Sequence, residues 1–253
     1  MFRLLILFLA LTLLPMGVLA QIPDGFFAED LTGLYVWPEG ANEEDASYIY
    51  RFTYPQLAGD DPITQTINNI YQYEASYALD FDCPMNGSSH DPAEGQMQVN
   101  ITYEVTHLSS DYLSLKVNKE MTVGESRIRV VTAHTFPLTG ERAGTVIALP
   151  FLLGILDRQE NDEWLIQRQT AKVDACVREM VWAQIEKAMR RDDSAIYPDM
   201  TFEEFEQYFY PEEEFHLNED GDLVFFITEG IIAPQDAGHF FFTITLEDLL
   251  DEI

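Results

Sequence analysis

The C-terminal stretch 215–253 constrains the fold of this chain more than any other segment. It predicts a strand, a tight turn, a second strand, an irregular connection, a third strand and a short acidic tail. Asp220-Gly221 indicates a two-residue type I′ hairpin turn, because Asp and Gly tolerate the positive φ values that this turn requires. Residues 223–228 are almost entirely apolar, which predicts a strand covered on both faces. Residues 240–246 repeat this pattern, and the proline and glycine before them disfavour a helix in the connection.

Alternating apolar and polar residues predict an antiparallel meander in the middle of the chain. Its three segments span residues 97–108, 111–121 and 127–138. In the first segment, apolar side chains at odd positions alternate with polar ones at even positions, as in a strand with one buried face. A further strand at 46–54 carries aromatic residues at alternate positions. We interpret these rings as the filling of one sheet face rather than as a ligand site.

Two longer segments show helical spacing of apolar residues. An acidic pair followed by Pro62 is a typical helix start, and this helix should end near residue 79. The segment 160–191 predicts a longer helix. A short capped helix should begin at Thr201 and end at Pro211. We therefore predict an α/β (α+β) domain, in which a mainly antiparallel sheet takes strands from both ends of the chain and packs against two principal helices.

The balance of charge is extremely acidic. The chain has 44 Asp and Glu against 14 Lys and Arg, a formal net charge of −30. Such a chain repels nucleic acid and anionic membrane surfaces, and it attracts cationic partners. Solubility or adaptation to salt is the alternative explanation. Half of the basic residues lie at 158–191, where we expect them to form internal ion pairs; a basic docking helix is the alternative.

The N-terminus has the features of a signal peptide. Arg3 supplies the positive charge, residues 4–14 the apolar segment, and small residues precede a cleavage site between Ala20 and Gln21. An uncleaved N-terminal anchor is the alternative. We expect no membrane span after this segment, and a single exported domain at 21–253 that is secreted or periplasmic.

Two cysteines, Cys83 and Cys176, predict one disulfide in an exported protein. Two buried free thiols are the alternative. A metal site would need further ligands, and no other His or Cys stands beside them at ligand spacing. The sequence also lacks the Gly-x-Ser-x-Gly and His-Glu-x-x-His motifs of hydrolases. We therefore predict no catalytic residue, no metal and no cofactor.

Several short motifs of the chain carry a family resemblance. They are Asp220-Gly221, residues 223–226, Ile232-Ala233-Pro234, Ala237-Gly238 and residues 241–246, together with Tyr54-Pro55-Gln56 leading into Ile67-Asn68. This pattern resembles the RsiV-type ectodomain, domain of unknown function 3298 (DUF3298), with its companion N-terminal module. The resemblance implies an N-terminal module at about 46–140 and a C-terminal module at about 141–253. Many members carry Gly-Gly-Ala-His in the middle, whereas this chain has Thr132-Ala133-His134.

The family resemblance implies a function in the cell envelope. RsiV-type domains occur in lysozyme-sensing anti-sigma factors and as non-catalytic modules beside peptidoglycan deacetylase domains. We therefore expect a non-catalytic binding or sensing domain for a cationic ligand, such as lysozyme or a cell-wall component. The alternative is an envelope hydrolase with a site of dispersed residues. The five histidines of the chain are scattered along the sequence, although His216 and His239 would approach each other if the last strands pair. A cavity that gathers a histidine with two carboxylates would favour the enzyme.

Overall fold

The computed structural model describes residues 25–82, 95–212 and 214–253, and for residues 77–82 the backbone alone. The signal segment, the cleavage site Ala20/Gln21 and Cys83 lie outside these residues. The described elements are β1 (Leu31–Trp37), η1 (Glu43–Asp45), β2 (Tyr48–Tyr54), α1 (Pro62–Asp82), β3 (Met97–Leu108), β4 (Tyr112–Val123), β5 (Ser126–Pro137), α2 (Leu149–Leu152), α3 (Glu163–Met189), α4 (Phe202–Glu206), β6 (Phe215–Leu217), β7 (Leu223–Ile227), η4 (Gln235–Ala237), β8 (Phe240–Ile244) and α5 (Leu246–Glu252).

A five-stranded sheet forms the first half of the fold, in the order β1-β2-β3-β4-β5. The predicted meander is confirmed, because β3, β4 and β5 pair antiparallel along nearly their whole length. The pair β2–β3 is parallel. Parallel neighbours need a crossover connection, and α1 lies in the connection between these two strands. The fold class is therefore the expected α+β arrangement with a mainly antiparallel sheet.

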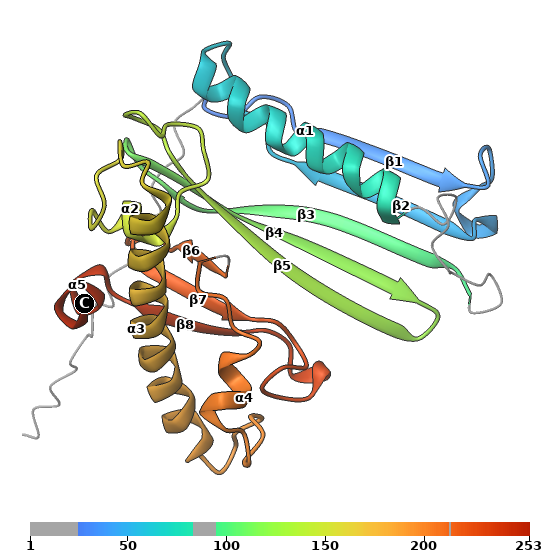
Figure 1. Cartoon of the computed structure of the whole chain (residues 1–253). Helices are drawn as coiled ribbons and strands as arrows, with labels where there is room; N and C mark the ends of the chain where they lie inside the picture. The colour runs from blue at the N-terminus through green and yellow to red at the C-terminus, as the bar shows by residue number, and fades with distance from the viewer. Residues whose placement is uncertain (1–24, 83–94, 213) are drawn as a thin grey trace, which may run out of the picture.

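The helix α1 covers one face of this sheet, as Figure 1 shows. It begins at Pro62, where Oδ1 of Asp61 accepts hydrogen bonds from Ile63 N (3.0 Å) and Thr64 N (3.1 Å). It continues to Asp82, three residues beyond the expected end. Below it lie the alternating aromatic side chains of β2, including the fully buried Tyr50. The interpretation of these rings as core residues is confirmed.

The second half of the fold is a smaller sheet, β6-β7-β8, packed against α3. All residues of β7 are buried, so the expected strand covered on both faces is confirmed. One face of α3, which includes Val177 and Val181, packs against the apolar side chains of this sheet. The helix begins after Asp162, whose Oδ1 accepts from Trp164 N (3.0 Å) and Leu165 N (3.2 Å). Within the described residues no helix is long and apolar enough to span a membrane.

The prediction of one sheet with strands from both ends of the chain is wrong, because the terminal strands form separate sheets. At the outer edge of β5, backbone groups form hydrogen bonds with residues that do not belong to a sixth strand. Ile147 N donates to Thr135 O (2.9 Å), and Gln235 Nε2 donates to Arg127 O (2.7 Å). The small sheet instead packs beside the face of the large sheet opposite α1 (Figure 1), where buried Ser114 Oγ accepts from Leu217 N at 3.0 Å.

The predicted β6–β7 hairpin is present, but its turn is not type I′. Gly221 has a positive φ of 87°, whereas Asp220 does not. Gly221 N donates to Asn218 O, and Asn218 N donates to Asp222 O, both at 2.9 Å. Asn218 Oδ1 also accepts from Asp222 N (2.9 Å). The longer loop needs only one left-handed residue, so glycine alone satisfies it.

Three local expectations need correction. The acidic tail is the helix α5, because Thr245 Oγ1 accepts from Asp248 N (3.0 Å) and caps it. The helix α4 ends at Glu206, well before Pro211. The connection between β7 and β8 contains one 3-10 turn, η4, in place of a wholly irregular path.

Candidate functional site

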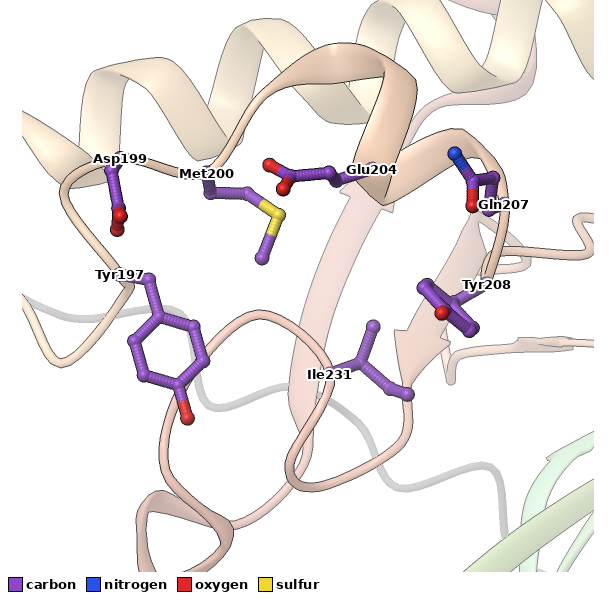
Figure 2. A pocket seen from close by; sticks show the side chains of 7 residues that line it. All are labelled: Tyr197, Asp199, Met200, Glu204, Gln207, Tyr208 and Ile231. Carbon is purple, nitrogen blue, oxygen red and sulfur yellow. The ribbon is translucent and has the colours of Figure 1, made fainter.

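A hollow of about 550 Å³ lies beside α4 in the C-terminal half of the fold. Figure 2 shows the seven side chains around it. They are Tyr197, Asp199, Met200, Glu204, Gln207, Tyr208 and Ile231. Tyr197 and Tyr208 stand at opposite ends, with the apolar Met200 and Ile231 between them. We call this site the acid–tyrosine hollow.

The start of α4 places one carboxylate of the hollow. Thr201 and Glu204 form a capping box, in which Thr201 Oγ1 accepts from Glu204 N (3.3 Å) and Glu204 Oε2 accepts from Thr201 N (3.0 Å). Thr201 Oγ1 also donates to Glu204 Oε2 (2.9 Å). These hydrogen bonds from Thr201 hold the pKa of Glu204 below its usual value. The Glu204 side chain is therefore an ordered carboxylate at neutral pH.

Buried aromatic packing fixes the α4 wall of the hollow. Phe205 and Phe209 are fully buried and stack with ring centroids 5.1 Å apart. Phe205 also contacts Trp182 of α3 at 5.7 Å. Because these phenylalanines face the core, the residues between them face outward, and Tyr208 is 56% exposed. The opposite wall is tied to the same core by Tyr197 N, which donates to Ile232 O (2.9 Å).

The chemistry of the hollow suits a cation. Its two carboxylates, Asp199 and Glu204, attract positive charge, and tyrosine rings attract cations through their faces. The whole segment 192–214 contains no Lys, Arg or His. Its acidic residues are Asp192, Asp193, Asp199, Glu203, Glu204, Glu206, Glu212, Glu213 and Glu214. The sequence patterns considered above did not predict this site. The pattern that could have indicated it is a segment in which tyrosines lie among acidic residues and no basic residue occurs.

His134 lies at the wall of a second hollow, of about 290 Å³, between α1 and the large sheet. Its Nδ1 is 3.2 Å from the Oη of buried Tyr71, and its Nε2 is 3.6 Å from Glu74 Oε1. Burial raises the pKa of Glu74 to about 7 and lowers the pKa of His134 to about 4. The uncharged forms of both groups are therefore favoured, in a hollow that gathers His134 with one carboxylate.

Two further histidines lie in the C-terminal half of the fold. His216 on β6 and His239 before β8 have the strand β7 between them. Each packs against the ring of Phe241, at 6.5 Å and 6.4 Å between centroids. Across the described ranges, no group of three or more His, Cys, Asp or Glu side chains has a geometry that could hold a metal ion.

Cys176 of α3 is half-buried, and its sulfur lies 4.0 Å from Met180 Sδ. Burial raises its pKa, so the protonated form is favoured. Its expected partner, Cys83, lies outside the described residues, and their disulfide stays a prediction.

The basic residues of α3 bind acidic side chains and carbonyl oxygens of the C-terminal half. Arg190 pairs with Glu186 at 3.4 Å, Lys172 Nζ donates to Ile253 O at 2.6 Å, and Arg178 Nε donates to Phe209 O at 3.3 Å. Arg191 also pairs with Asp193 at 3.1 Å. Within the described residues, part of the expected ion pairing is therefore present, whereas Lys172 and Arg178 bind the backbone.

The similarity of this chain to known proteins lies in its fold. No protein-family model and no curated protein matches the sequence. Among solved structures, a DUF3298 family member from Bacteroides fragilis superposes with a TM-score of 0.54 at 14% identity, covering 90% of this chain and 94% of its own. A DUF3298 family protein from Pseudomonas aeruginosa gives a TM-score of 0.49 at 13% identity, covering 88% and 91%. The first match shows that this chain shares the fold of a DUF3298 protein.

Proposed function

We propose that this chain is an exported, non-catalytic binding or sensing domain of the cell envelope, which captures a cationic ligand in the acid–tyrosine hollow. The ligand is a basic protein such as lysozyme, or a cationic cell-wall component. One observation carries the proposal: two exposed tyrosine rings and two carboxylates surround one hollow. The net charge of −30 adds attraction over a longer range.

The charge and the hollow contribute different parts of the binding. A strongly negative surface accelerates the encounter with a basic protein, and salt weakens this steering. Specific affinity needs a shaped contact, because charge alone gives weak and promiscuous attraction. Tyr197 and Tyr208 supply such a contact, since a lysine or arginine head can lie on a ring face and reach Asp199 or Glu204. An exposed cation–π contact contributes about 0.5–1 kcal/mol.

Two further arguments support a binding role. The fold is shared with a DUF3298 protein, and the sequence motifs resemble RsiV-type domains, which sense lysozyme in anti-sigma factors. This resemblance favours lysozyme over other basic proteins as the first ligand to test.

The test is titration calorimetry of the mature protein with lysozyme and with isolated peptidoglycan, at low and at physiological salt. We expect binding that weakens with salt but persists. Tyr208→Ala and Asp199→Asn should each weaken it about fivefold, as loss of about 1 kcal/mol implies. Tyr73→Ala, which removes a ring 66% exposed on α1, and Glu39→Gln on an exposed loop are the matched controls. Binding that disappears at physiological salt, or that falls equally in the controls, would contradict the proposal.

The alternative function is an envelope hydrolase, for which the hollow beside His134 is the candidate site. A catalytic imidazole needs a ring nitrogen free to reach the substrate. In this structure Nδ1 faces Tyr71 and Nε2 faces Glu74, so both nitrogens have protein neighbours. This arrangement supports a structural role. Release of reducing sugars or peptides from peptidoglycan by the wild-type chain, and its loss in His134→Ala, would favour the enzyme instead.

A further inference from the structure

The polar face of the large sheet forms one wall of a separate cavity. On this face, opposite α1, even-numbered positions of β3 and β4 carry polar side chains, and Thr102 stands directly across from Asn118 in the strand register. The start of β8 covers part of this face and leaves a cavity of about 310 Å³. That volume is at the lower end of the roughly 300–1,000 Å³ of small-molecule sites. Its lining includes Asn100, Thr102, Asn118, Arg129, His239 and Phe241.

Neutral polar side chains line the cavity. Among the described residues, those of Asn100, Thr102 and Asn118 form no hydrogen bond within the protein; Asn100 and Thr102 are exposed, and Asn118 is half-buried. Nε2 of His239 is buried and also has no hydrogen-bond partner there. Buried polar atoms in folded proteins are nearly always paired, so an unpaired nitrogen at a cavity wall points to a missing partner.

The charged groups around the cavity are already paired. Arg129 binds Glu229 at 2.8 Å, and the Glu120 carboxylate at the same wall binds Arg127. Lys119 also lines the cavity and has an interaction within the protein. The remaining polar groups are amides, a hydroxyl and an imidazole. Burial and the nearby cations Arg129 and Lys116 outweigh the attraction of Glu229 and lower the pKa of His239, which keeps this imidazole neutral. Each of these neutral groups can both donate and accept hydrogen bonds.

An aromatic ring completes the site. Phe241 is 48% exposed, and its ring lies 6.4 Å from that of His239 between centroids. Lys116 Nζ lies over this ring, 5.5 Å from its centroid. A ligand that fits must therefore offer closely spaced groups that donate and accept, no net charge, and an apolar face for the ring. Sugar hydroxyls and the C–H face of a pyranose meet these requirements together.

We propose that this cavity binds a neutral saccharide, held by Asn100, Thr102 and Asn118 on the sheet and by the ring of Phe241 on β8. The site is separate from the acid–tyrosine hollow, because none of its lining residues belongs to α4 or its flanking loops. It does not depend on the proposed function, since either site can bind without the other.

The experiment is saturation-transfer NMR of the mature protein with glucose, galactose, mannose, N-acetylglucosamine and chitobiose, each at millimolar concentration. We expect saturation transfer to at least one of these sugars. Asn118→Leu and Phe241→Ala should each weaken its binding about tenfold, while Phe241→Tyr, which keeps the ring, should retain it. Asn161→Leu and Tyr73→Ala, both on exposed sites elsewhere, should leave it unchanged.

Amide chemical shifts supply a second readout that does not depend on variants. Addition of the bound sugar should shift resonances of β3, β4 and β8 rather than those of α4. Absence of transfer to every sugar in the panel would overturn the proposal, as would unchanged binding in a folded Asn118→Leu protein. Binding of inorganic phosphate at these strands in place of any sugar would overturn it too, because it would show an anion site.

Discussion

Glu229 binds Arg129 through both of its carboxylate oxygens: Oε1 accepts from the backbone N–H at 2.7 Å, and Oε2 accepts from Nε at 2.8 Å. The Glu229 side chain is only 3% exposed. It belongs to the loop between β7 and β8, whereas Arg129 lies on β5. This contact therefore joins the C-terminal loop to the edge of the large sheet, and it occupies a backbone donor that another strand would otherwise pair with.

Replacement of Glu229 should destabilise the fold. Glu229→Ala leaves the Arg129 N–H and guanidinium without their partner, and we expect a loss of about 2–4 kcal/mol in the free energy of unfolding. Urea denaturation followed by tryptophan fluorescence would measure it. The exposed pair Arg190–Glu186 provides the control, because Glu186→Ala should cost less than about 0.5 kcal/mol. Equal losses in the two variants would argue against a special role for Glu229.

The same contact should make the protein acid-sensitive. Burial alone would raise the pKa of Glu229, but hydrogen bonds from Arg129 and Gln235, together with the charge of Arg129, bring it below its usual value of 4.5. A carboxyl whose pKa is lower in the folded state contributes stability above its unfolded pKa and loses it as the pH falls through the folded pKa. Stability should therefore decrease below about pH 4.5, and it should decrease less steeply in Glu229→Gln.

Glu74 and His134 should have opposite effects on stability as the pH changes. The pKa of Glu74 is raised from 4.5 to about 7, so its contribution is complete below pH 4.5 and is lost as the pH rises through about 7. The pKa of His134 is lowered from 6.5 to about 4, so its contribution is complete above pH 6.5 and is lost as the pH falls through about 4. Where these pH ranges overlap, the stability contribution of Glu74 falls with rising pH while that of His134 increases.

Single substitutions should separate these two slopes. Glu74→Gln removes the Glu74 contribution, so its stability relative to wild type should rise from pH 4.5 to about 7. His134→Asn removes the His134 contribution, so its stability relative to wild type should fall from about pH 4 to 6.5. Chemical denaturation across this range would measure both, with Glu186→Gln as a control. Parallel pH profiles for the two variants would show that burial does not set these pKa values.

Ser114 should couple the two sheets. Its hydroxyl is fully buried, lies 2.8 Å from Thr135 Oγ1 and accepts from Leu217 N. Ser114→Ala leaves a buried N–H on β6 without a partner, and we expect a loss of about 1–3 kcal/mol. Ser76→Ala, at an exposed position on α1, should change stability by less than about 0.5 kcal/mol. Limited proteolysis of the wild type that yields two independently folded halves would contradict a single coupled domain.

The disulfide is tested by mass spectrometry of the exported protein. Peptides containing Cys83 and Cys176 should be linked, and the N-terminal peptide should begin at Gln21. In the chain-entropy model, closure of so long a loop contributes about 4–5 kcal/mol, so reduction should lower the unfolding temperature. Alkylation of both thiols without prior reduction would rule out the pairing.

Local features of this fold could be predicted from the sequence because their signals lie within a few residues. The alternation in 97–108 predicted β3, the apolar spacing in 160–191 predicted α3, and Thr201 with Glu204 predicted the capping box. Each of these depends on backbone geometry and on which face of one element is apolar. The extreme acidity was likewise a property of the sequence alone.

The hollows are formed by contacts between residues far apart in the sequence, which no local sequence pattern predicts. Tyr71 and His134 are in contact although they are 63 residues apart in sequence. Ile231, in the loop between β7 and β8, lines the same hollow as Tyr208. The division into two sheets depended on which groups reached the edge of β5, where Ile147 and Glu229 take the positions that a strand would have taken. Such pairings are decided when distant segments compete for the same hydrogen-bonding groups and apolar surface, and only the folded chain resolves that competition.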